Sequence, residues 1–281
     1  MFFLNKNTMI PFVEKYNKNL DICFFLHANG FPPDAYKTLL SLIESKYTTK
    51  SMLLRPLWKE KGNIDKANSW NIFLNDFLNH CNENNSGQNI GLGHSIGGNI
   101  LIRSAIKNKN LFKSIVLLDP TIFHPSIILI WKTLNLLNIF KWIHPYASAA
   151  RNRREEYDTY GEIVESYKKK GVFSKINNAQ LEEYINSIFK YKNGKYKLVY
   201  NKEWEEIIYL KAALKDFDIW NNLNSLTIPT LIIKPDNNPV LRKKASKKLL
   251  KNKFITIKTI EKSTHLFPLE YPKETSNLIL D

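Results

Sequence analysis

Glycine is scarce in this 281-residue chain, and the few glycines gather at one place. Four of the ten lie in the segment Gly91-Leu92-Gly93-His94-Ser95-Ile96-Gly97-Gly98. The segment contains G-x-S-x-G, a pattern that chance would give only about 0.02 times in a chain of this composition. Residues 89–92 resemble a strand and residues 96–108 have a helical pattern. The pattern therefore predicts a sharp strand-to-helix turn with Ser95 at its apex.

A serine at such a turn is a candidate nucleophile. The strained backbone leaves no room for side chains two residues before and two residues after it, and both positions hold glycine. The turn would raise Ser95 Oγ above the carboxyl edge of the sheet and put the Ile96 N–H at the positive end of the following helix, where it can stabilise an oxyanion. The alternative is a glycine-rich turn with a bystander serine. A dinucleotide-binding G-x-G-x-x-G is disfavoured, because it would need glycine where Ile96 stands.

Apolar runs typical of buried strands alternate with amphipathic helical patterns over most of the chain. The predicted strands are 22–26, 50–54, 89–92, 114–118, 230–233 and 254–257, and the predicted helices are 34–45, 70–82, 96–108, 239–251 and 268–280. This alternation predicts an α/β fold, with a mostly parallel sheet and helices on both faces.

One long interval breaks the alternation. Residues 121–225 contain no convincing buried strand, only helix-like patterns such as 148–167 and 178–189. We therefore expect a core built from residues 1–120 and 226–281, with a helical cap or lid inserted at 121–225.

A second segment, His27-Ala28-Asn29-Gly30-Phe31-Pro32, follows the first strong strand. With it and the Ser95 turn, the chain resembles the α/β-hydrolase family, most of all its soluble lipase/esterase-like serine hydrolases. Further matches are residues 55–58, 117–120, 148–154 and 265–270. The resemblance implies the α/β-hydrolase fold, a Ser-His-Asp triad and an acyl-enzyme. It also implies an oxyanion hole that combines the N–H of Ile96 with the N–H of Asn29, or of Gly30 if the register differs by one. The His27 side chain is expected to be structural.

The catalytic base and acid are predicted from their places in the chain. His265 follows the last predicted strand after a short polar loop, and the order Ser then His is the order of this family's triad. The family's usual acid position, after strand 230–233, falls on Asn238 or Pro239. Asp236, the nearest carboxylate, is therefore the preferred acid, and Asp119, at the end of the preceding strand, is the alternative.

The predicted activity is that of a carboxylic ester hydrolase, of class EC 3.1.1. Trp131, Trp142 and Tyr146 in the cap are candidates to line an apolar acyl pocket, which would favour medium-chain over acetyl esters; the alternative is that they form the cap's own core. Other triad activities on this fold, namely thioesterase, carbon–carbon bond hydrolase or perhydrolase, stay open. A non-catalytic binding protein with the same fold is a further alternative.

Charge and cysteine content limit the partners. The chain has 41 Lys and Arg against 26 Asp and Glu, a net charge of +15, but only six of the cations are arginine. No pattern of arginines and aromatics suits base stacking, so no nucleic-acid partner is expected. An anionic membrane surface stays possible through the basic surface and the segment 127–143, which its Lys and Asn residues make a poor transmembrane span.

Cys23 and Cys81 give neither a disulfide framework nor a metal-binding spacing, and the N-terminus lacks a secretory signal pattern. A reducing, cytoplasmic location is expected, with no metal and no cofactor. The pattern leaves the oligomeric state open.

Overall fold

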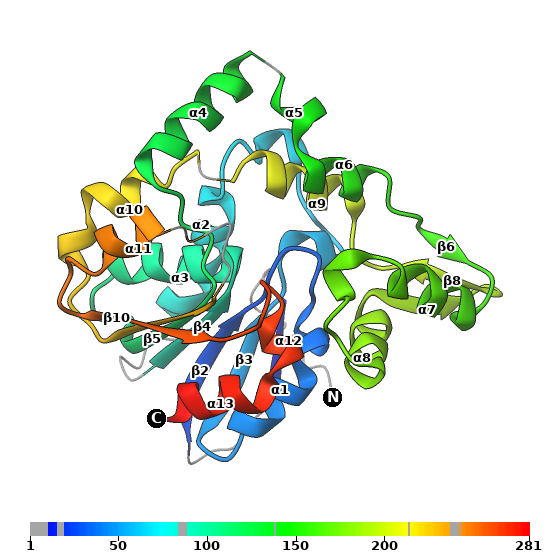
Figure 1. Ribbon diagram of the computed structural model, residues 1–281, viewed down its shortest axis with the longest axis horizontal. Helices are drawn as coiled ribbons and strands as arrows, with labels where there is room; N and C mark the ends of the chain where they lie inside the picture. The colour runs from blue at the N-terminus through cyan, green and yellow to red at the C-terminus, as the bar shows by residue number, and fades with distance from the viewer. Residues whose placement is uncertain are drawn as a thin grey trace.

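A computed structural model describes residues 11–15, 20–83, 89–137, 139–212, 214–236, 241 and 243–281. Its centre is a seven-stranded sheet in the order β1-β3-β2-β4-β5-β9-β10 (Figure 1). The strands are β1 (Phe12–Lys15), β2 (Asp21–Leu26), β3 (Tyr47–Met52), β4 (Asn89–His94), β5 (Phe112–Leu118), β9 (Thr230–Pro235) and β10 (Ile255–Ile260). Only β1 runs antiparallel to its neighbour, β3. The predicted α/β fold with a mostly parallel sheet is confirmed.

Helices cover both faces of this sheet, which explains why its strands are apolar on both sides. In β2, Phe24 and Leu26 pack toward one face, while Cys23 and Phe25 pack toward the other. The first face is covered by α2 (Asn71–Glu83), α3 (Ile96–Lys107) and α11 (Lys243–Leu249), and the second by α1 (Lys37–Ile43), α12 (Phe267–Glu270) and α13 (Pro272–Leu280).

Several predicted boundaries moved for local reasons. The strand predicted at 50–54 is β3, which ends at Met52, before a 3₁₀ turn over Arg55–Leu57. The helix predicted at 268–280 is two helices, because Pro272 begins a new one after Tyr271. Part of the predicted helix 239–251 lies outside the described residues, and α11 begins at Lys243.

Residues 121–225, which we call the cap, lie between β5 and β9 and occupy the top and right of Figure 1, except for α10, which lies at the left beside α11. They contain α4 (Pro125–Leu136), α5 (Phe140–Ile143), α6 (Pro145–Arg151), α7 (Tyr160–Lys168), α8 (Asn178–Ile188), α9 (Lys202–Leu210) and α10 (Phe217–Asn221). Helix α6 packs on α9, and α8 packs on the 3₁₀ turn Pro33–Tyr36 of the core. The described residues contain no helix that combines the length and the apolar character needed to cross a membrane.

The cap also holds a small antiparallel sheet that the sequence pattern did not predict. Its strands are β6 (Glu156–Tyr157), β8 (Lys195–Leu198) and β7 (Phe189–Lys192), paired in that order. The turn between β7 and β8 places Asn193 and Gly194 at φ of 55° and 79°, the conformation of a tight hairpin. These strands are short, and β7 and β8 are rich in lysine, so they lack the apolar run by which a buried strand is predicted. The helix predicted at 148–167 is therefore replaced by α6, β6 and α7.

Candidate active site

Ser95 lies in a strained turn between β4 and α3. Its φ of 56° and ψ of −116° are rare for a residue with a side chain. A Cβ on Gly97 would lie 2.0 Å from the Leu26 carbonyl oxygen, and one on Gly93 would lie 2.6 Å from the Gly97 carbonyl carbon. Both positions of the G-x-S-x-G pattern therefore require glycine, for the steric reason that the sequence predicted.

His265 lies in the loop between β10 and α12, at the carboxyl edge of the sheet. Its Nδ1 is 2.5 Å from Oδ2 of Asp119, a residue with no exposed surface directly after β5. The Asp119 N–H donates to the Ile233 carbonyl over 2.7 Å, which fixes the carboxylate at the end of the sheet. With Nδ1 donating to this carboxylate, the lone pair of the ring lies on Nε2, as a general base requires.

This geometry corrects the sequence-based preference for Asp236. Asp236 is exposed, and its Oδ2 accepts a hydrogen bond from the Lys262 N–H over 3.0 Å. The carboxylate thus supports the turn after β10, and the alternative residue, Asp119, is the one that meets His265. Asn238 and Pro239, where the family usually places its acid, lie outside the described residues.

A buried hydrogen-bond chain positions the loop that carries His265. The His94 ring has no exposed surface and lies 2.6 Å from the Tyr36 hydroxyl through Nδ1 and 2.9 Å from the His265 carbonyl oxygen through Nε2. Burial holds the pKa of His94 well below its usual value, so the ring is neutral. A single tautomer satisfies both bonds: Tyr36 donates to Nδ1, and Nε2–H donates to the carbonyl.

A second contact holds the same loop from its other side. Glu270 Oε2 accepts from the Thr264 N–H over 2.9 Å, and the Thr264 hydroxyl donates to Glu270 Oε1. The sequence analysis identified neither Tyr36 nor Glu270, because each acts through the tertiary structure.

Ser95 Oγ is 3.0 Å from the hydroxyl of Thr121, and in the described part of the chain no hydrogen bond joins it to His265. Such catalytic hydrogen bonds are often long before substrate binds. Thr121 is fixed by Asn99, whose Nδ2 donates to the Thr121 carbonyl and to Asp216 Oδ1, each over 2.8 Å. Asp216 is buried, and loss of hydration raises its pKa to about 6.

Two backbone N–H groups near Ser95 are candidates for an oxyanion hole. Within the described residues, neither the Asn29 N–H nor the Ile96 N–H donates a hydrogen bond. The Asn29 side chain is held on both sides: its Nδ2 donates to the Glu205 carbonyl over 2.9 Å, and Tyr200 donates to its Oδ1 over 3.1 Å.

The His27 side chain braces the start of this loop. Its Nδ1 donates to the Ala28 carbonyl over 2.7 Å, and its Nε2 accepts from the Leu54 N–H over 3.1 Å. Burial lowers the pKa of His27 to about 4, which keeps the ring neutral. These contacts agree with the expected structural role.

A buried ion pair joins the cap to the candidate oxyanion loop. Arg153 Nη1 lies 2.8 Å from Glu205 Oε2, and Arg153 Nη2 donates to the Tyr184 hydroxyl over 3.2 Å. Glu205 Oε1 would lie 2.8 Å from a Cβ on Gly30, whose φ is 77°. The sequence analysis missed Glu205. The available clue is that Glu205 shares one face of α9 with the apolar residues Trp204 and Ile208.

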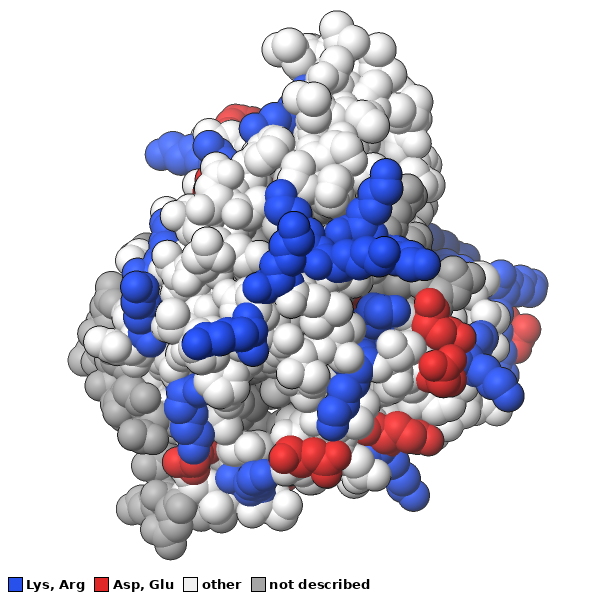
Figure 2. Space-filling view, turned by 60° about the vertical axis from the view of Figure 1, so that its left-hand side comes forward, with Lys and Arg blue, Asp and Glu red and all other residues white. Residues whose placement is uncertain are grey.

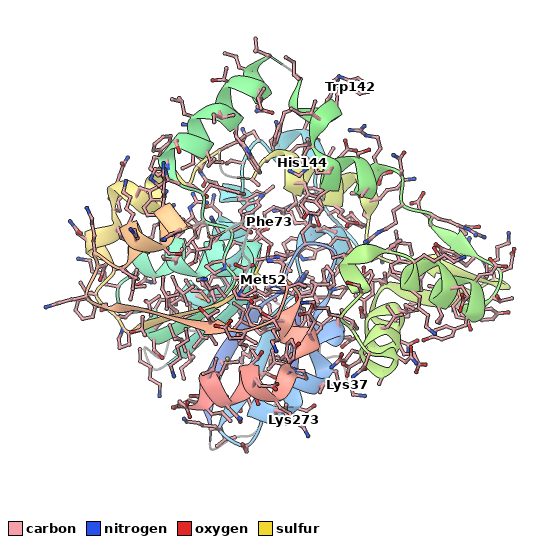
Figure 3. All side chains as sticks on the ribbon, in the orientation of Figure 1. Lys37, Met52, Phe73, Trp142, His144 and Lys273 are labelled. Atoms are coloured by element: carbon pink, nitrogen blue, oxygen red, sulfur yellow. The ribbon has the colours of Figure 1, made fainter. Side chains whose placement is uncertain are left out.

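The predicted pocket residues differ in their surroundings. Trp131 packs on Phe123 and Phe140, at centroid distances of 4.5 and 4.7 Å, and so belongs to the interior of the cap. Trp142 is 71% exposed and extends away from the molecule beyond α5 (Figure 3). Tyr146 is 58% exposed. Trp142 therefore does not line an enclosed pocket.

A hollow of about 380 Å³ lies away from this site, between α1, β3 and α8. Its wall includes Lys37, Ser51 and Glu183, and none of Ser95, His265 and Asn29 borders it. Figure 3 places Lys37 at this lower right edge of the core. We do not connect this hollow with the chemistry at Ser95.

The described residues include no cluster of three or more His, Cys, Asp or Glu side chains suited to a metal ion. Both cysteines are buried thiols, and burial raises the pKa of each to about 12. They are therefore poor nucleophiles at neutral pH.

The chain is similar in structure to several known hydrolases, at sequence identities that show the fold alone. E-2-(acetamidomethylene)succinate hydrolase has a TM-score of 0.79 and 14% identity, over 99% of this chain and 98% of that one. The thioesterase domain of the curacin biosynthetic pathway has a TM-score of 0.72 and 13% identity, over 100% and 98%. An esterase of M. tuberculosis has a TM-score of 0.72 and 15% identity, over 99% and 90%.

No curated protein matches the chain by sequence. A family model does match, over residues 59–271, which is more than half of the chain, and its description is serine aminopeptidase, S33. The chain therefore belongs to this family of α/β-hydrolases.

Proposed function

We propose that the protein is a serine hydrolase of carboxylic ester-like substrates, with Ser95 as nucleophile, His265 as base and Asp119 as acid. The observation that carries the proposal is the pairing of His265 Nδ1 with the buried Asp119 carboxylate, at the same sheet edge as the strained Ser95 turn. Nucleophile, base and orienting acid are the three parts that acyl transfer requires.

The reaction would proceed in two halves. Ser95 Oγ attacks the substrate carbonyl carbon and passes its proton to His265 Nε2, while the N–H groups of Asn29 and Ile96 bind the oxyanion. The tetrahedral intermediate expels the alcohol, which takes the proton from His265, and leaves an acyl group on Ser95. Water then attacks the acyl-enzyme with His265 as base again and releases the acid. Each oxyanion donor contributes about 3 kcal/mol to the transition state.

The Thr121 hydroxyl adds a specific feature to this mechanism. At 3.0 Å it orients Ser95 Oγ in the resting site, and the Ser95 hydroxyl hydrogen must point away from Thr121 when His265 accepts the proton. A hydroxyl hydrogen can turn by rotation about one bond, so the contact orients the nucleophile without a large barrier to reaction.

Two observations bear on the substrate. The similar structures include an esterase and a thioesterase. Both act on an acyl group, which is bonded to oxygen in an ester and to sulfur in a thioester, so the substrate panel includes both. The preference for medium-chain over acetyl groups stays a prediction, because Trp131 packs inside the cap on Phe123 and Phe140.

The test combines labelling with a substrate panel. Wild type and the Ser95→Ala variant would be treated with a fluorophosphonate probe and assayed on p-nitrophenyl esters of rising chain length, acyl-coenzyme A thioesters and anilides. Ser126→Ala, an exposed serine in the cap, is the matched control. We expect wild type and Ser126→Ala to be labelled at Ser95 and to release a burst of p-nitrophenol. Ser95→Ala should show neither. Absence of labelling and of turnover on the whole panel would favour a non-catalytic binding protein.

A further inference from the structure

The segment from α4 to the start of α6 presents a cluster of large apolar side chains to solvent. Eight of the twelve such side chains found exposed among the described residues lie here, with 43% to 82% of their surface accessible: Leu129, Ile130, Leu136, Leu137, Ile139, Trp142, Ile143 and Tyr146. We call this cluster the cap tip. Single exposed apolar residues are ordinary on proteins, whereas a cluster of this kind marks an interaction surface.

Most of the cap tip is the outer face of α4 and α5, which form the apex of the molecule in Figure 1, and Tyr146 of α6 adjoins it. The inner face of α4 and α5 is packed: Ile128 is fully buried, and the Trp131 ring packs against Phe140 at 4.7 Å. The exposed residues therefore cannot turn inward without unpacking the cap. Only contact with another molecule can therefore remove these side chains from water.

Most charges around the cap tip are positive, although Glu206 pairs with Arg151 there and Arg153 is buried against Glu205. From Pro120 to Arg154 the chain has no Asp or Glu and five cations. Lys141 and Arg151 lie against the Trp142 ring, at 5.0 and 5.8 Å from its centroid. The cations thus border the apolar side chains directly.

The basic surface continues below the tip, over α10 and α11. Lys132 of α4 lies 4.7 Å from the Phe217 ring of α10, and Lys248 of α11 lies 5.0 Å from the Trp220 ring of the same helix. Figure 2 shows an uncharged projection at the top with Lys and Arg side chains gathered below it, while most Asp and Glu side chains in this view lie lower. The apolar tip is thus bordered by a basic band.

We propose that the cap tip docks the protein onto the surface of an anionic lipid bilayer. The apolar side chains of α4 and α5 would enter the headgroup region, and the surrounding Lys and Arg side chains would lie beside the lipid phosphates. The apolar side chains suit the acyl-chain side of the headgroup region, and the cations suit its layer of phosphates. A second copy of the chain fits less well, because two copies joined tip to tip would bring two basic bands together.

The docking is peripheral, and its proposal does not rest on the proposed catalysis. Helix α4 has 12 residues, about 18 Å of helix, too short to span a bilayer. Attraction to an anionic surface is worth about fivefold in affinity for each nearby Lys or Arg at low salt, and it weakens as salt shortens the screening length.

The test measures cosedimentation with vesicles of phosphatidylcholine, with and without phosphatidylglycerol. We expect binding to the anionic vesicles that falls as NaCl is raised, and at least tenfold weaker binding for the double variant Leu136→Ser, Trp142→Ser. Tyr191→Ser, whose 64% exposed ring lies on β7 at another part of the cap, is the matched control and should bind like wild type. A charge variant, Lys132→Glu with Lys141→Glu, should lose binding while leaving the apolar tip intact.

Trp142 gives a direct readout, since it is the one tryptophan of six found among the exposed large apolar residues. Anionic vesicles should shift its emission to the blue, and the shift should vanish in Trp142→Phe. Near-ultraviolet circular dichroism would confirm that each variant is folded. Three results would overturn the proposal: no binding at low salt, binding indifferent to phosphatidylglycerol, or tip variants that bind normally but change the protein's mass in solution, which would identify a second copy as the occupant.

Discussion

The exchange of Asp119 for Asn is the sharpest test of the catalytic arrangement. The carboxylate is fully buried, and its Oδ2 is 2.5 Å from His265 Nδ1, so the ring is held with its proton on Nδ1. An amide NH₂ at this position would face Nδ1 as a donor and favour the opposite tautomer, with the proton on Nε2. His265 could then no longer accept the proton of Ser95.

The expected size of the effect follows from this loss of tautomer control. In a serine-protease triad the same exchange lowers kcat about 10⁴-fold, which is roughly 5.5 kcal/mol of transition-state stabilisation. Substrate contacts are unaffected, so KM should stay near its wild-type value. The fold should tolerate the change, because Asp119 has a φ of 38° and Asn is among the residues best suited to positive φ.

Asp236→Asn is the matched control for this measurement. Asp236 is exposed, and an Asn side chain keeps an oxygen that can accept from the Lys262 N–H. We expect kcat within about twofold of wild type. Steady-state kinetics on the best ester of the panel would compare the two variants. The reasoning fails if Asp236→Asn loses as much activity as Asp119→Asn, or if a folded Asp119→Asn protein keeps a tenth of wild-type kcat.

Three further predictions concern the supports of the site. Gly97→Ala should prevent folding or cost more than about 4 kcal/mol, since its Cβ would lie 2.0 Å from a backbone oxygen, whereas Gly171→Ala, with no atom within 4 Å, should leave urea unfolding nearly unchanged. Tyr36→Phe removes the buried donor to His94 at 2.6 Å and should cost about 1–3 kcal/mol in urea unfolding and lower kcat more than it raises KM; an unchanged kcat would refute the positioning role. Asp216 has a folded pKa of about 6 against 3.8 for the ordinary group, so the stability that its protonated form contributes is present below pH 3.8 and is lost as pH rises through 6. Asp216→Asn should therefore flatten that part of the stability–pH curve, and thermal unfolding at a series of pH values would measure it.

The sequence predicted the parts of the site that depend on local patterns. Ser95 was predicted to be the nucleophile because its turn requires glycine two residues before and two residues after it, and both glycines are present. His265 was predicted to be the base because it follows the last strand after a short loop. The acid was harder. Asp119 and Asp236 follow β5 and β9, which are neighbours in the sheet, so both reach the same edge. The choice depends on which carboxylate turns toward His265, and no local pattern records that direction.

The cap was predicted least well, and for a physical reason. Strand β6 has only two residues, and β7 and β8 are largely exposed and carry lysines, so none of them has the pattern of a buried strand. The buried pair of Arg153 and Glu205 joins residues far apart in the chain, and charged side chains are ordinarily predicted to face solvent. For Trp142 the error was the opposite: as a large aromatic residue it was predicted to be covered, in a pocket or in the cap's core, and it is exposed.

The two ends of the cap are attached to the core in different ways, which bears on how substrate enters. Helix α9 is tied to the core by hydrogen bonds: the Glu205 carbonyl accepts from Asn29 Nδ2 over 2.9 Å, and the Ile208 carbonyl accepts from Trp70 Nε1 over 2.9 Å. Moving α9 would break these bonds and disturb the candidate oxyanion loop itself. Helix α4 meets the core through α10, where Trp220 Nε1 donates to the Phe123 carbonyl over 2.7 Å.

An opening of the cap that keeps the two hydrogen bonds of α9 leaves that helix in place. Helices α4 and α5, which carry most of the cap tip, make neither bond, although Ile128 and Trp131 pack inward. The chain from α4 back to the nucleophile is short, because Thr121, which contacts Ser95 Oγ, precedes the helix by four residues. A bilayer that drew α4 outward would thus act on the hydroxyl that holds Ser95. Vesicles should then change the rate of fluorophosphonate labelling in wild type and leave it unchanged in Leu136→Ser, Trp142→Ser.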